Sequence, residues 1–87
     1  MSNLTKPTIH MNGTSASSLL ELYADASATV RVAIDDVAKT GPHGRDYYPQ
    51  GDEALTKAIE QHRARLQKLE DVLKELEELA LHCAEHA

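Results

Sequence analysis

The sequence predicts an all-α protein: an antiparallel two-helix hairpin with a short extended N-terminal segment, assembling as a homo-oligomeric helical bundle. Two long stretches carry apolar residues at alternating spacings of three and four, the period of helices that pack side by side. The 87 residues include no Phe, no Trp and three Tyr, so the apolar side chains are almost entirely Leu, Val, Ile and Ala. This composition suits interdigitating helices better than a sheet, and the length fits a single domain, 1–87.

Residues 1–13 predict an N-terminal tail that ends in a turn. Asn12-Gly13 is a strong turn signal, and the segment before it shows no helical period. Either Thr14 or Ser15 then caps a helix, because a hydroxyl at this position accepts a hydrogen bond from a free amide of the first turn.

The first helix is expected over residues 14–39. Lys39 complements the dipole at its C-terminal end, and Gly41-Pro42 stops it, with Gly41 in the left-handed cap conformation. Its apolar stripe comprises Ala16, Leu19, Tyr23, Ala26, Val30, Ala33 and Val37, widened by Leu20 and Ile34.

The second helix is expected over residues 52–84, with the carboxylate of Asp52 as its cap and no Gly or Pro inside. Its seam comprises Leu55, Ile59, His62, Leu66, Leu69, Leu73, Leu76, Ala80 and Cys83, widened by Ala58, Val72 and Leu79. The two helices differ in length and both carry a second apolar flank, and a lone hairpin is marginally stable. We therefore expect self-association, either as a dimeric four-helix bundle or as a larger ring of hairpins.

The loop over residues 40–51 is the predicted functional segment, because about twelve residues exceed the ~2–8 that helix connections usually need. Tyr47 and Tyr48 offer rings that stack on bases, while Arg45 offers a charge for phosphate and Gln50 a directional hydrogen bond. Asp46 belongs to the same predicted site. Alternatively, the tyrosines cap the end of the bundle and Arg45 pairs with a neighbouring carboxylate.

His62 and Arg65 interrupt the apolar seam of the second helix and complete the predicted ligand site. We expect Leu55 to lie opposite Val37, which places His62 two turns below the loop. In the functional interpretation both side chains help to hold an anion. In the structural one, a buried His62 fixes the register of the bundle and Arg65 extends to solvent.

Composition argues against several other functions. The net charge of −5 disfavours DNA binding, and no apolar stretch is long enough to cross a membrane. A single cysteine, Cys83, and no secretory signal indicate the cytoplasm. His82, Cys83 and His86 do not form a convincing metal site, because histidines in a last turn commonly complement the dipole. We expect no cofactor and no catalytic set, and hence no enzyme.

The segments 9–15 (IHMNGTS) and 44–51 (GRDYYPQG) resemble small proteins encoded by tailed bacteriophages, a likeness that covers most of the chain. In size and helical plan, though not in binding motifs, the chain is also similar to phage sponge proteins that sequester cyclic nucleotide immune signals, the anti-CBASS and anti-Thoeris proteins. These resemblances imply a non-catalytic anti-defence protein in the cytoplasm of an infected bacterium. It would bind a cyclic oligonucleotide or an ADP-ribose derivative.

Two other functions are compatible with the same sequence. The chain could be a helical interaction module that inhibits or scaffolds a host or phage protein, such as a host defence protein, through its exposed apolar flanks. It could also be a structural component of the virion.

Overall fold

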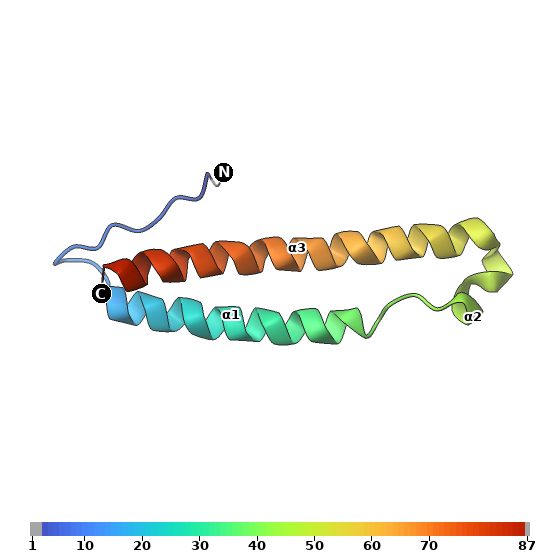
Figure 1. Cartoon of the computed structure of the whole chain (residues 1–87), viewed down its shortest axis with the longest axis horizontal. Helices are drawn as coiled ribbons and strands as arrows, with labels where there is room; N and C mark the ends of the chain where they lie inside the picture. The colour runs from blue at the N-terminus through green and yellow to red at the C-terminus, as the bar shows by residue number, and fades with distance from the viewer. Residues whose placement is uncertain (1–2, 87) are drawn as a thin grey trace.

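The computed structural model describes residues 3–86, and within that range all regular structure is helical. Helix α1 spans Ala16–Ala38, α2 spans Gly44–Tyr47, the short 3₁₀ helix η1 spans Tyr48–Gln50, and α3 spans Asp52–Glu85. Helices α1 and α3 lie side by side and run in opposite directions, with α2 at the far end of the molecule (Figure 1). The result is a thin rod of 61 × 24 × 17 Å. No helix in the described range is long and apolar enough to cross a membrane.

Helix α1 begins as the sequence predicts and ends differently. Of the two candidate caps, Ser15 is the residue used: its Oγ accepts a hydrogen bond from the Ser18 amide at 3.1 Å. At the other end the amides of residues 39–41 each bond to the carbonyl three residues earlier, which tightens the last turn. The predicted left-handed cap at Gly41 is wrong, because within residues 3–86 only Gly51 has positive φ.

Helix α3 is not capped by Asp52, and that prediction is wrong as well. Gly51 is the N-cap, with φ 97° and ψ 164°, a backbone conformation that is essentially restricted to glycine. Asp52 instead lies in the first turn beside Glu53, where both carboxylates complement the helix dipole. At ~1.5 Å per residue, α3 is about 51 Å long and α1 about 35 Å.

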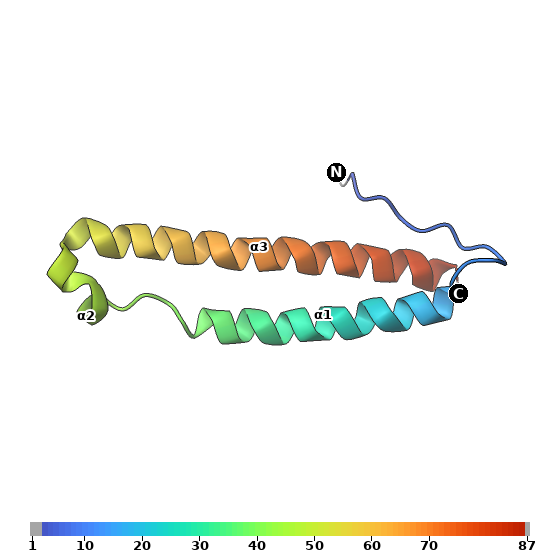
Figure 2. The same cartoon turned by 180° about the vertical axis from the view of Figure 1, so that it is seen from behind.

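The pairing register differs from the predicted one. An ideal Cβ on Gly41 would lie 3.6 Å from His62 Nε2, so the end of α1 faces the His62 level of α3, and Val37 is not opposite Leu55. The loop does not turn back directly after α1. It continues in the direction of α1 along the first turns of α3 and reverses only at α2 and η1 (Figure 2). The extra loop residues therefore compensate for the difference in helix length.

The interior between the helices is thin. Among residues 3–86, the buried apolar residues are Ala16 and Cys83, and the buried polar ones are Ser27 and His62. The seam leucines and valines are half-buried. Ser27 is satisfied because its hydroxyl donates to the Tyr23 carbonyl at 2.8 Å.

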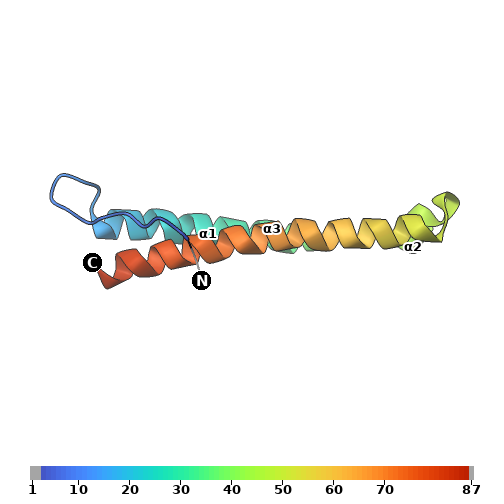
Figure 3. The same cartoon turned by 90° about the horizontal axis from the view of Figure 1, so that it is seen from above.

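The N-terminal tail, described from residue 3, turns back beyond the end of α3 and runs along its C-terminal half, with most of its residues exposed and Leu4, Pro7 and Ile9 half-buried (Figures 1 and 3). His82 Nε2 lies 2.7 Å from the Pro7 carbonyl oxygen. Because a carbonyl only accepts, Nε2 carries the proton and donates it. Cys83 next to it has no exposed surface. The tail is therefore part of the fold, as a third segment packed on α3.

Candidate functional site

The predicted loop site is an ordered double turn. His43 caps α2, because its Nδ1 accepts a hydrogen bond from the Arg45 amide at 3.2 Å, which places its proton on Nε2. The Gly51 amide closes η1 on the Tyr48 carbonyl at 3.2 Å. Within the predicted loop 40–51, residues 44–50 thus form two short helical turns that present successive side chains in different directions.

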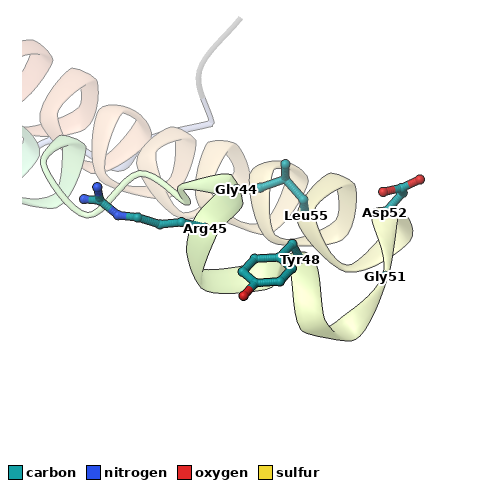
Figure 4. A pocket seen from close by; sticks show the side chains of 6 residues that line it. All are labelled: Gly44, Arg45, Tyr48, Gly51, Asp52 and Leu55. Atoms are coloured by element: carbon teal, nitrogen blue, oxygen red, sulfur yellow. The ribbon is translucent and has the colours of Figure 1, made fainter.

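One concavity, of about 350 Å³, lies where this double turn meets the start of α3. Of the predicted site residues, Arg45 and Tyr48 contribute to its wall, together with Leu55 and Asp52. Their polar ends do not converge, however. Figure 4 shows the Arg45 guanidinium extending away from both the Tyr48 ring and the Asp52 carboxylate.

A second concavity, of about 410 Å³, lies beside the first turns of α3 and takes the remaining loop residues. Tyr47 and Gln50 line it with Glu53, Lys57 and Gln61. The two tyrosines, adjacent in sequence, are thus divided between two concavities. A helical turn explains the division, because successive residues point about 100° apart.

The other three predicted site residues line neither concavity. Asp46 and Arg65 are exposed. His62 is 9% exposed and lies beneath Gly41, and its buried Nδ1 has no hydrogen-bond partner among residues 3–86. The described chain therefore does not bring the seven predicted residues into one site.

The charges around the loop do not favour an anion. Arg45 shares its concavity with Asp52, and Lys57 shares the other with Glu53. Asp52 and Glu53 are also the residues at the N-terminus of α3, where the free amides would otherwise attract a phosphate. Sequence reasoning did not assign these two acids to the site, although their position directly after Gly51 signalled it.

A lateral groove between α1 and α3 is a further surface that the sequence analysis did not single out. Its two sections have volumes of about 440 and 280 Å³ and share Arg31 and Glu77. The floor is apolar, with Ile34 and Leu73 in one section and Ala24 and Ala80 in the other. We call this surface, lined by Ala24, Ser27, Arg31, Ile34, Asp35, Glu70, Leu73, Lys74, Glu77 and Ala80, the lateral groove.

One ion pair crosses the lateral groove. Arg31 Nη2 lies 2.8 Å from Glu77 Oε2, and the two side chains are 55% and 49% exposed. Solvent screens a pair as open as this one, so it stabilises the helix pair weakly.

The histidines near the C-terminus have structural partners. His86 Nδ1 donates to the His82 carbonyl oxygen at 2.7 Å, while His82 holds the tail through Pro7. Within residues 3–86, no group of three or more His, Cys, Asp or Glu side chains is placed to hold a metal ion.

No family model, no curated protein and no solved structure matches this chain.

Proposed function

We propose that this chain is a non-catalytic helical interaction module that binds through the lateral surface of its helix pair, first of all to copies of itself as a homo-oligomeric bundle. The main observation behind this proposal is that several large apolar side chains of the helix pair are exposed to solvent. Leu22 and Val32 on α1 are 63% and 60% exposed, and Leu81 on α3 is 60% exposed. These three side chains lie on the helix pair outside the lateral groove, and large apolar side chains that remain exposed add to the surface a partner can cover.

The overall dimensions support association. The accessible surface is 6569 Å², whereas a compact monomer of this mass has about 5,100 Å². The radius of gyration is 18.4 Å, against about 12 Å for a compact chain of this length. The excess of roughly 1,500 Å² includes apolar flanks that a partner would remove from water, at about 25 cal/mol per Å².

The lateral groove suits an amphipathic helix as partner. Small side chains at Ala24 and Ala80 allow a close approach, while Ile34 and Leu73 offer an apolar floor. Charged residues of both signs, Arg31 and Glu77 among them, line the same groove and would orient the incoming helix.

The test replaces two different alanines by glutamate, so that the two variants differ in the position of the new charge and not in its chemistry. Ala24→Glu places a charge in the lateral groove, whereas Ala64→Glu places the same charge on an exposed part of α3 outside it. We expect the wild type and Ala64→Glu to form oligomers whose mass, by light scattering, falls on dilution. Ala24→Glu should be monomeric at the same concentrations. A wild type that stays monomeric at every concentration up to its solubility limit would refute the proposal.

The biological setting of this module is proposed from the resemblance to phage proteins. We place it in the cytoplasm of an infected bacterium, where it inhibits or scaffolds a host or phage protein, with a host defence protein as the candidate target. A virion role predicts stoichiometric protein in purified particles, which a mass-spectrometric count would detect.

A second candidate function is the sequestration of a nucleotide-derived immune signal, and one observation favours it: Arg45 and Tyr48 line the same concavity. Arg45 would contact phosphate and Tyr48 would stack on a base. Titration calorimetry with cyclic dinucleotides and ADP-ribose tests this function, with Arg45→Ala expected to abolish binding. The absence of heat for every such compound would leave the interaction module alone.

A further inference from the structure

We propose that α3 pairs with the α3 of a second copy in antiparallel orientation, across the lateral groove, at a two-fold axis near the level of Val72. This geometry rests on the self-association proposed above and specifies it. Three observations carry it: the charge pattern along α3, the position of the tail and the arrangement of charges in the groove.

The charges along α3 are separated by sign. Residues 57–68 carry four basic side chains against one acid, and residues 70–85 carry six acids against one base. The structure places both halves on one uninterrupted helix, and nearly all of these side chains are exposed. Parallel pairing would place like charges together, whereas antiparallel pairing places each basic half beside the partner's acidic half.

The tail leaves the lateral groove free. It is held by His82, which is two residues from Ala80 and therefore about 200° around the helix from that groove residue. The flank of α3 that carries the tail is occupied, and the flank that faces the groove is open. A second copy therefore has access to the groove along α3 from Glu70 to Ala80.

The groove itself contains a reciprocal charge pair. Glu70 and Lys74 both line it, and they lie symmetrically about Val72. In an antiparallel pair centred there, Glu70 of one copy meets Lys74 of the other, and the same contact recurs across the axis. A standard interface takes about 800 Å² from each partner, and the surface of the whole rod exceeds that of a compact chain by more than this amount.

Spin labels distinguish this geometry from others. Glu60 and Asp71 are exposed on α3, and each is replaced by cysteine in a separate variant and spin-labelled. The native Cys83 is fully buried, so the unmodified protein serves as the control for labelling at that residue. The expected distance between labels in a dimer is within about 20 Å at residue 71. At residue 60 the expected label-to-label distance is about 36 Å, because residue 60 of each copy lies twelve residues from the axis, on opposite sides, and each residue adds ~1.5 Å along the helix.

The outcomes separate the two proposals. A dimer with equal short distances at both positions would be parallel and would overturn the geometry, while self-association would stand. A dimer with no dipolar coupling at either position would also overturn it. Labelled protein that is monomeric by light scattering would overturn both.

Discussion

Replacing His62 by leucine should stabilise the protein, although the histidine is almost fully buried in the seam between the helices. Its Nδ1 is removed from water and has no hydrogen-bond partner within the described chain. An unpaired buried polar group of this kind costs about 1–3 kcal/mol, whichever tautomer is present. Leucine is of similar size and continues the leucine pattern of the seam.

The expected gain in unfolding free energy is therefore about 1–3 kcal/mol. For a chain of this length, each kcal/mol raises Tm by roughly 4–8 °C. Urea and thermal unfolding followed by helical circular dichroism at pH 8 measure both quantities. All variants are compared at one protein concentration, because association raises apparent stability by mass action.

His82→Leu is the matched control, since it makes the same chemical change on the same helix. His82 donates a 2.7 Å hydrogen bond to the Pro7 carbonyl, so its removal should lower the unfolding free energy by about 0.5–1.5 kcal/mol. The two variants are thus expected to change stability in opposite directions. A loss of stability in His62→Leu similar to that in His82→Leu would show that His62 Nδ1 has a partner in solution, and the reasoning would be refuted.

Three other substitutions test local features of the fold. Gly51→Ala should cost about 1–3 kcal/mol in urea unfolding purely from backbone strain, because φ is 97° and, within residues 3–86, no atom beyond its two chain neighbours lies within 4 Å of the added Cβ. Gly44→Ala is its control: the new Cβ would lie 3.8 Å from Leu55, an ordinary contact, and an equal loss there would exclude the strain explanation. Ser15→Ala should cost about 1 kcal/mol through loss of the α1 cap, and an unchanged midpoint would show that water replaces the hydroxyl. Arg31→Ala should lower stability by less than about 1 kcal/mol, by an amount that shrinks at high salt, and a loss that is independent of salt would contradict a screened surface pair.

The candidate sites were predicted only in part from the local sequence. The sequence predicted a loop between the two long helices, and in the structure Arg45 and Tyr48 from this segment line one concavity. It missed the short helical turns that direct Tyr47 elsewhere, because a four-residue helix leaves no periodic pattern. The lateral groove was missed because it is formed by two segments whose relative register the sequence does not reveal.

The sequence by itself determined the helical class, the presence of two long helices and their ends to within one or two residues. These features follow from periodicity and capping, which act over a few neighbouring residues. The charge separation along α3 was equally visible, because it is a property of residue order alone.

Only the tertiary structure decided the register of the helices, the path of the loop and the position of the tail. Gly41 meets His62, and Pro7 meets His82, through contacts between residues far apart in the chain. A seam that repeats every seven residues fits its partner at several offsets, so the pattern cannot select one of them. The choice among offsets depends on the sum of packing and hydrogen bonds over the whole molecule.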